Sequence, residues 1–386
     1  MERLKTMKVA LVHDYLVENN GGAERVLEVL ASMWPEAPIF VLLYDPDKAS
    51  PVWKTKDIRT SFLEKIPFFN RHYKWLLALM PLATELHDLS GYDVVISSTS
   101  AFAKAIITHA DTVHLSYIHT PTRYLWSDSQ SYLKAQHLPP ILNELTAWEL
   151  SRLRRFDFDA AARVDQLIAN SKTVQKRITK YYRRDSTVIY PPINIDLFAI
   201  SPSIGDYFLA GGRIVAYKKF DLIVEAFNQL GYPLVIFGDG PELNNLKDKA
   251  KNNITFVGRI SEIEKARFYQ KCLAYINPQE EDFGITVIEA MASGRPVIAY
   301  NKGGATETVI DGVTGILFDE QTPAALISAI KQFRAYNFVP QTIRDQSLKF
   351  DAQIFIKNIR DCVVASLAAH HQLAPKETVL EKTSHS

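Results

Sequence analysis

The sequence contains only two cysteines, Cys272 and Cys362. Their spacing matches neither a zinc-ligand motif nor a disulfide framework, so neither kind of crosslink organises the fold. We interpret both residues as structural thiols and expect a reducing compartment.

Long hydrophobic runs are also missing. No apolar stretch reaches the roughly 18 residues of a membrane span. The N-terminus lacks the apolar core and the small-residue cleavage site of a signal peptide. We therefore expect a cytoplasmic protein, either free or at the inner face of a membrane.

Neither sign of charge is in excess. The chain has 44 Lys and Arg residues against 43 Asp and Glu residues, so no global field favours nucleic acid or an acidic membrane. We expect no nucleic-acid partner, and any basic site must be local.

The length of 386 residues predicts two or three domains. Beyond residue 205, strand-like and helix-like segments alternate, with helices expected over 220–230 and 323–333; this rhythm favours a doubly wound parallel α/β sheet. Two prolines that break a strand mark a boundary near 190–205. We expect an N-terminal domain over 1–195, a C-terminal domain over 196–349, a last helix near 350–369 that packs back on the first domain, and a flexible tail over 370–386.

The first half begins with a strand over residues 8–12, the polar loop His13-Asp14-Tyr15, and then Gly21 and Gly22 at the start of a helix. Glycines allow close backbone approach, and a helix start presents unpaired N–H groups, so this loop suits a phosphate. Taken alone, the pattern favours an ordinary βα turn.

Three more strand candidates, over 92–98, 106–108 and 114–119, have polar residues at their C-terminal ends. Ligands bind at that edge of open α/β sheets. The third strand ends at His119, and Arg123 follows a proline-stiffened turn. A structural and a functional interpretation of His119 have equal weight here.

The triplet Asp45-Pro46-Asp47 has the Asp-x-Asp form seen in metal-dependent sugar transferases. The central proline follows a strand directly, so we interpret it as a turn and expect no metal site.

Residues 62–82 interleave basic and aromatic side chains on an amphipathic segment. This composition suits a lipid interface, and it suits a helix packed on the domain core equally well.

In the second half, Gly212 and Arg213 end a strand and Lys218 lies near the next helix start. Basic side chains there oppose the helix dipole, and an anionic ligand such as a diphosphate would explain them. Gly238-Asp239-Gly240 lacks the third glycine of a dinucleotide fingerprint, which makes an oxidoreductase a weak interpretation.

Two carboxylates, Glu281 and Glu289, lie eight positions apart. In one helix they would be about 12 Å apart along the axis, beyond the roughly 5–9.5 Å of glycosidase acid and base pairs. We therefore expect each to bind hydroxyl groups at a different part of one extended ligand. The backbone amides of Phe283, Gly284 and Ile285 would hold phosphates between them.

Taken together, these motifs resemble the family 4 glycosyltransferases of the GT-B fold, and the resemblance covers nearly the whole chain. The motifs that match are Gly21-Gly22-Ala23-Glu24; His119-Thr120-Pro121 with Arg123-Tyr124 and Trp126; Gly212-Arg213 with Tyr217-Lys218 and Asp221; Gly238-Asp239-Gly240-Pro241; Glu281 through Glu289; and Gly303-Gly304 with Glu307. The resemblance implies two Rossmann-like domains facing across a cleft, with the acceptor on the first and a nucleotide sugar on the second.

The resemblance also implies roles by position. Catalytic residues would be His119 at the transferred sugar, Glu281 at the donor hexose, and Arg213 and Lys218 at the leaving diphosphate. Substrate-binding residues would be Gly21, Gly22, Arg123, Gly212, Phe283, Gly284, Ile285 and Glu289, the last at the ribose. No cofactor or metal is expected, because fixed cations and helix-start N–H groups can neutralise the leaving group. The anomeric configuration would be retained.

The His-Thr-Pro-Arg-Tyr pattern is similar to a bacterial branch that extends surface polysaccharides, often on lipid-linked acceptors. GDP-mannose is a frequent donor there, and UDP- or GDP-glucose stay open. Two alternatives also stay open: a nucleotide-sugar epimerase of the same fold, and a non-catalytic nucleotide-sugar binding protein.

Overall fold

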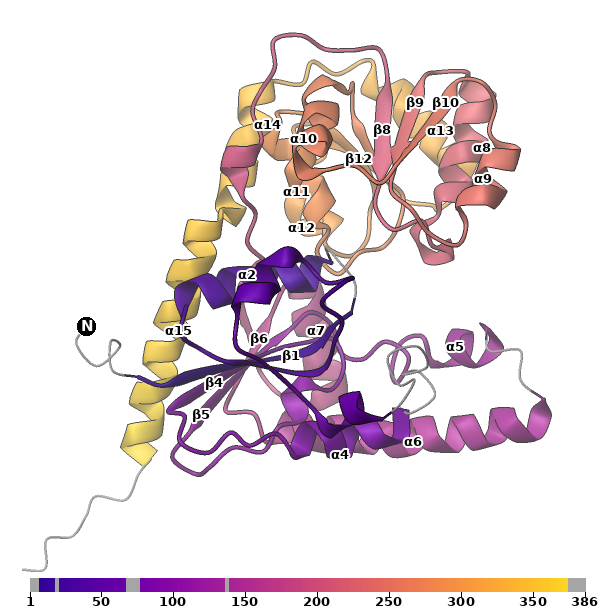
Figure 1. Cartoon of the computed structure of the whole chain (residues 1–386). Helices are drawn as coiled ribbons and strands as arrows, with labels where there is room; N and C mark the ends of the chain where they lie inside the picture. Colours follow the sequence, from indigo (N-terminus) through magenta and orange to yellow (C-terminus); the bar gives the residue numbers. More distant parts are fainter. Residues whose placement is uncertain (1–6, 18–20, 67–76, 136–138, 374–386) are drawn as a thin grey trace, which may run out of the picture.

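The computed structural model describes residues 7–17, 21–66, 77–135 and 139–373 of the chain. Figure 1 shows two α/β domains, one above the other, and a long C-terminal helix that runs alongside both. Each domain is built around its own parallel sheet.

The N-terminal sheet has seven strands in the order β3-β2-β1-β4-β5-β6-β7, all parallel. The strands are β1 (Val9–Leu16), β2 (Ile39–Tyr44), β3 (Ile58–Thr60), β4 (Val94–Thr99), β5 (Val113–Ile118), β6 (Gln166–Ala169) and β7 (Thr187–Val188). The connecting helices are α2 (Gly22–Met33), η1 (Pro51–Thr55), η2 (Phe62–Lys65), α4 (Met80–Glu85), η4 (Ala103–Ala105), α5 (Ser129–Ala135), α6 (Pro140–Ala162), α7 (Lys172–Tyr182) and η5 (Ile195–Leu197).

The C-terminal sheet has six parallel strands in the order β10-β9-β8-β11-β12-β13. They are β8 (Phe208–Gly211), β9 (Leu234–Phe237), β10 (Ile254–Gly258), β11 (Tyr275–Asn277), β12 (Val297–Tyr300) and β13 (Gly315–Phe318). The helices are η6 (Ala216–Lys218), α8 (Phe220–Leu230), α9 (Leu243–Lys249), α10 (Glu262–Lys271), α11 (Ile285–Ala292), α12 (Ala305–Thr308), α13 (Pro323–Phe333), α14 (Pro340–Ser347), η7 (Leu348–Phe350) and α15 (Ala352–Leu373).

Both domains are therefore doubly wound α/β units, which confirms the predicted fold class. The central strands β4 and β5 are buried along their whole length, as expected for strands covered by helices on both faces. The last helix, α15, buries Phe355, Ile359 and Val363 in the hydrophobic core of the N-terminal domain. It continues to Leu373, past the expected start of the tail at 370, and residues 374–386 lie outside the described part.

The first strand is longer than predicted. Residues His13 and Asp14 belong to β1 and are buried, because β1 lies between β2 and β4 in the middle of the sheet. The Asp14 carboxylate accepts backbone N–H groups from Ser100, Ala101, Phe102 and Ala103, at 2.6–2.9 Å.

The strand predicted over 106–108 is wrong. Asp14 holds residues 100–103 in a tight turn that leads into η4, and the chain then passes to β5 without pairing. Ile106 is buried against the sheet, whereas Ile107 is 53% exposed, so the hydrophobicity of Ile106 indicated burial and not a strand.

Both cysteines were predicted to be structural thiols, and Cys272 fits this prediction better than Cys362. Cys272 is buried and Cys362 is half-buried, and neither forms a disulfide. Burial raises the pKa of Cys272 to about 12, so it is a neutral thiol. The triplet at residues 45–47 forms a turn in which Asp45 pairs with Lys48 at 2.6 Å.

Candidate functional site

The C-terminal edges of the two sheets face each other. In Figure 1 helices α2 and α7 of the N-terminal domain lie next to α11 and α12 of the C-terminal domain. Gly22 shows how close this approach is: a Cβ atom added there would lie 3.0 Å from Cδ1 of Ile285. The predicted site residues of the two domains therefore lie at one interface.

The structure brings Lys218 and Glu281 together. The Lys218 Nζ lies 3.2 Å from Oε1 of Glu281, and Gln279 donates to the same oxygen at 3.1 Å. Gly212 has a φ of 125°, which glycine adopts without strain. A side chain there would approach the Lys218 ammonium at 3.2 Å. Gly212 thus leaves room for a cation beside a carboxylate.

The loop that holds Glu281 is fixed by its backbone. The carbonyl oxygen of Glu281 accepts the N–H of Gly304 at 2.8 Å, and Gly303 has a φ of 65°. The next residues start α11, with Gly284 as its N-cap at a φ of 91°. The Phe283 side chain packs between Tyr190 and Phe350, so only its backbone is available to a ligand.

Glu289 is the most deeply placed of the predicted residues, with 0% of its side chain exposed. Its Oε1 accepts from Arg25 at 2.5 Å and from Lys265 at 2.9 Å, and Oε2 accepts from Tyr269 at 3.2 Å. Burial alone would raise the pKa of Glu289, but Lys265 and Arg25 outweigh burial and lower that pKa. The carboxylate is therefore ionised and held by a cation from each domain.

Arg123 also reaches across the interface. It donates to Asp282 at 2.7 Å, and its guanidinium lies 6.0 Å from the ring of Tyr217. Arg177 of α7 contacts the other oxygen of Asp282 and pairs with Glu280 at 3.1 Å. Two arginines of the N-terminal domain thus hold the carboxylate next to Glu281.

A third contact joins the domains at the start of α7. The Glu307 carboxylate accepts the backbone N–H groups of Lys172 and Thr173, both at 2.8 Å, and the hydroxyl of Tyr190 at 3.2 Å. A carboxylate at a helix N-terminus is favoured by the helix dipole. The loop that carries the Gly303-Gly304 motif therefore joins the two domains through Glu307.

His119 lies just past the end of β5 and is 9% exposed. Its Nε2 is 2.8 Å from Oγ of Ser98, whose carbonyl oxygen accepts from Nδ1 of His13 at 2.8 Å. Burial, with a smaller effect from His13, lowers the pKa of His119 to about 3. The imidazole is therefore neutral at neutral pH and suits hydrogen bonding better than proton donation.

For two other predicted site residues, Arg213 and Gly21, we describe only exposure or backbone conformation. Arg213 follows Gly212 with an exposed side chain. Gly21 caps α2 with an extended backbone.

Sequence reasoning missed Arg25, Arg177, Lys265 and Asp282. A basic residue in the first turn of a helix opposes the dipole, and this signal could have identified Arg25. Arg177 and Lys265 lie on amphipathic helices, where a cation normally faces solvent, so their roles depend on the neighbouring domain or helix.

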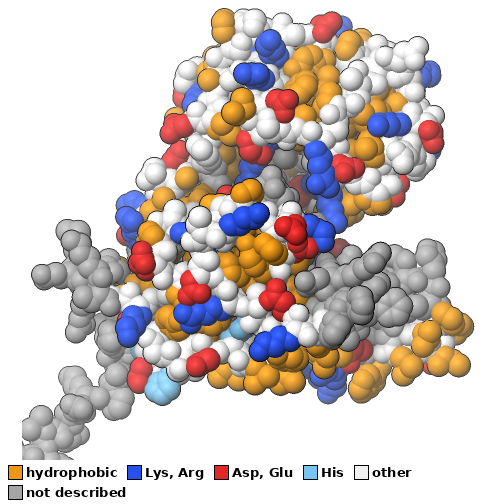
Figure 2. Space-filling view, viewed as in Figure 1, with side chains coloured by type: hydrophobic (Ala, Val, Ile, Leu, Met, Phe, Trp, Pro, Cys, Tyr) orange, Lys and Arg blue, Asp and Glu red, His pale blue; other side chains and the backbone are white. Residues whose placement is uncertain are grey.

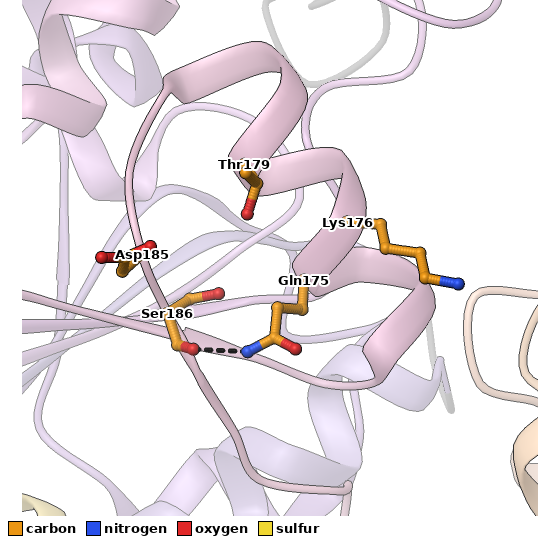
Figure 3. Close-up of a pocket in the computed structure, with 5 residues that line it drawn as sticks. All are labelled: Gln175, Lys176, Thr179, Asp185 and Ser186. Carbon is orange, nitrogen blue, oxygen red and sulfur yellow. Dashed lines mark hydrogen bonds between the residues drawn. The ribbon is translucent and has the colours of Figure 1, made fainter.

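The described residues hold no group of three or more His, Cys, Asp and Glu side chains arranged to bind a metal ion. A pocket of about 440 Å³ lies beside α7 and is lined by Gln175, Lys176, Thr179, Asp185 and Ser186; Figure 3 shows these side chains. None of these is a predicted site residue, and Nε2 of Gln175 donates a hydrogen bond to the carbonyl oxygen of Ser186 at 2.6 Å. We assign no role to this pocket.

Comparison with known proteins gives matches along both domains. The family model described as Glycosyltransferase Family 4 matches residues 20–197, and the model described as Glycosyl transferases group 1 matches residues 200–337.

Curated relatives are moderately similar. An uncharacterized glycosyltransferase of Methanocaldococcus jannaschii is 27% identical over 222 residues, 56% of this chain and 62% of that protein. The alpha-1,3/1,6-mannosyltransferase ALG2 of Dictyostelium discoideum is 28% identical over 278 residues, 58% of this chain and 63% of that protein. The chain thus spans less than two thirds of the length of these relatives.

Solved structures match over more of the chain. The complex of Anabaena HepE with UDP and glucose has a TM-score of 0.69 at 20% identity, over 93% of this chain and 100% of that one. Sucrose-phosphate synthase of Thermosynechococcus elongatus has a TM-score of 0.69 at 19% identity, with the same coverage. At such identities the likeness concerns the fold.

Proposed function

Because the chain belongs to the family 4 glycosyltransferases and has their GT-B fold, we propose that it transfers a hexose from a nucleotide sugar to a saccharide acceptor. The anomeric configuration is retained, and mannose or glucose is the sugar. The acceptor is lipid-linked and belongs to surface polysaccharide synthesis. The relatives named mannosyltransferases support this sugar class.

The observation that supports this proposal most directly is the Lys218–Glu281 pair beside Gly212. An ammonium and a carboxylate at the ends of β8 and β11 suit the two ends of the bond that breaks. Lys218 stabilises the charge that develops on the leaving diphosphate, while Glu281 accepts hydrogen bonds from sugar hydroxyls.

The remaining residues orient the reactants. His119 is a neutral imidazole just past the end of β5, and it forms a hydrogen bond with the transferred sugar. No covalent nucleophile stands out, so we propose that the acceptor attacks from the face that the diphosphate leaves, through an oxocarbenium-like state.

The proposal predicts turnover of a nucleotide hexose without added metal. Purified protein is incubated with GDP- and UDP-linked mannose and glucose, with and without EDTA, and release of GDP or UDP is measured. We expect release with one donor and no loss in EDTA. Loss of turnover in EDTA would contradict metal independence. An epimerase would convert the sugar without transfer, and a binding protein would bind donor without turnover.

We also propose contact with a membrane, at a surface only partly within the predicted segment 62–82. Of that segment, residues 67–76 lie outside the described part, and Leu63 and Met80 are buried in the domain core. None of the helices in the described part of the chain has the length and hydrophobicity of a transmembrane segment. Contact would therefore be peripheral.

The surface that fits a bilayer is the α4–α6 patch, which we define as the exposed large apolar side chains at α4 and in the N-terminal half of α6. Figure 2 shows hydrophobic side chains along the lower edge of the N-terminal domain, over these helices. One salt bridge, between Glu85 of α4 and Arg163 directly after α6, places α4 beside the C-terminal end of α6. The patch consists of Leu82, Leu86, Ile141, Leu145 and Trp148, each 49–75% exposed.

Two arginines lie next to the apolar residues of the patch on α6. On α6, the spacing of Ile141, Leu145 and Trp148 places them on one face. Arg152 and Arg155 follow on the same face, and Arg152 pairs with Glu149 at 2.7 Å, so Arg155 is the cation that is left for a lipid headgroup. Arg155 is exposed and pairs with no described acidic residue. An apolar face with tryptophan and arginine fits the boundary between headgroups and acyl chains. We therefore assign the patch to an anionic bilayer.

Replacing Leu145 and Trp148 together with glutamine should lower binding to phosphatidylglycerol-containing vesicles by about tenfold or more, because the apolar contribution is lost. Vesicle co-sedimentation measures this. The matched control is Ile204→Gln, an exposed isoleucine outside the patch. Equal binding by both variants would contradict the assignment, as would a concentration-dependent dimer that the double variant abolishes without lipid.

A further inference from the structure

Four charged side chains form a closed cluster where α2 meets α10 and α11. Arg25 donates to Glu289 at 2.5 Å and to Glu262 at 2.7 Å. Lys265 pairs with the same two carboxylates, at 2.9 Å each. The cluster has two positive and two negative charges, and Arg25 is its one member from the N-terminal domain.

The cluster closes Glu289 to any ligand. A carboxylate oxygen has about two sites for hydrogen bonds, and Oε1 of Glu289 already accepts from Arg25 and Lys265. The side chain is fully buried. Oε2 accepts from Tyr269 at 3.2 Å, so at most one site of the carboxylate is free. A pair of sugar hydroxyls needs two sites and therefore reaches this carboxylate only if one of the two cations withdraws.

Arg25 is the cation that can withdraw without leaving a buried charge unpaired. Lys265 would still neutralise Glu289, and Arg25 would keep its contact with Glu262, whose side chain is 43% exposed. Removing Lys265 instead would need a rearrangement within α10 and α11. An uncompensated buried charge costs several kcal/mol. When hydroxyl groups replace a cation at Glu289, withdrawal of Arg25 is therefore favoured over withdrawal of Lys265.

We propose that Arg25 gates the donor site: its guanidinium competes with the hydroxyl groups of the nucleotide for Glu289, and the same contact is one of those that join the two domains. The identity of the ligand rests on the proposed function, whereas the contact between domains does not. While Arg25 occupies Glu289, the fraction of protein able to bind nucleotide is reduced, and the measured affinity falls in proportion.

The test uses Arg25→Met in the full chain. The distance between two spin labels, one on each domain, is measured by dipolar EPR without nucleotide, and binding of UDP and GDP is measured by calorimetry. We expect longer and broader distances in the variant and a Kd lower by roughly threefold to tenfold. Arg25→Lys keeps the positive charge but loses the bidentate contact with Glu289 and Glu262. Its label distances and its Kd should lie between those of Arg25→Met and those of the unchanged chain.

Arg59→Met is the matched control, because Arg59 pairs with Asp57 and Tyr92 inside the N-terminal domain. Unchanged distances in Arg25→Met would overturn the proposal, and so would weaker nucleotide binding. If the distances lengthen but neither nucleotide binds any form of the protein, the contact between domains stands and the proposed function fails.

Discussion

Replacement of Lys218 with alanine is expected to lower the transfer rate by about 10²–10³-fold, the usual effect of removing one preorganised group that stabilises developing charge. The variant should fold normally, because the Lys218 side chain lies at the site and outside the hydrophobic clusters. Its ammonium lies 3.2 Å from Glu281, so in the proposed mechanism its loss removes a cation that stabilises the leaving diphosphate.

Turnover of the donor for which the assay with GDP- and UDP-sugars gives release, under saturating conditions, measures this effect. Lys247→Ala is the matched control, since Lys247 is exposed on α9 of the same domain. Lys218→Arg should retain part of the activity, because it keeps the charge but changes the donor geometry. Full activity in Lys218→Ala would remove this residue from the mechanism.

Replacement of Asp157 with alanine is expected to destabilise the N-terminal domain by about 3–5 kcal/mol. Asp157 and Lys104 form an ion pair with side chains only 4% and 2% exposed. The aspartate also accepts from Thr122 at 3.0 Å, Trp126 at 2.7 Å and Tyr182 at 2.9 Å. Without it, a buried ammonium and three polar groups lose their partner.

Urea unfolding followed by tryptophan fluorescence measures this loss, and all five tryptophans lie within the first 148 residues, so the signal reports the N-terminal domain. Asp159→Ala is the control, because Asp159 is exposed two positions further along α6. The double replacement Lys104→Met with Asp157→Leu should recover much of the loss, since no charge is left unpaired. A midpoint that does not change in Asp157→Ala would refute the argument.

The sequence predicts the elements well where hydrophobic period and helix signals agree. Helices over 220–230 and 323–333 were predicted at their observed bounds, because each has an apolar face and a clear start or end. The strand β13 was not predicted, since it has only four residues and begins at Gly315, which leaves little pattern to detect.

The candidate site also contains residues that the sequence predicts and residues that it does not. Glu281, Lys218 and Gly212 lie together because neighbouring parallel strands end at one edge of the sheet, and this follows from the order of motifs. Arg25 and Arg177 meet their carboxylates only once two separately folded sheets face each other. The basic residue at the start of α2 indicates that Arg25 has an anionic partner, but nothing in the local sequence of α2 or α7 identifies Glu289 or Asp282 as that partner.

The contacts of Glu307 and Asp282 have a consequence for evolution. Each carboxylate binds groups that belong to the other domain. A C-terminal domain taken from a relative would need these charges to match Arg123, Arg177 and the start of α7. Exchange of C-terminal domains by recombination is therefore limited by positions at the contact between the domains, and the two halves of the chain must change together.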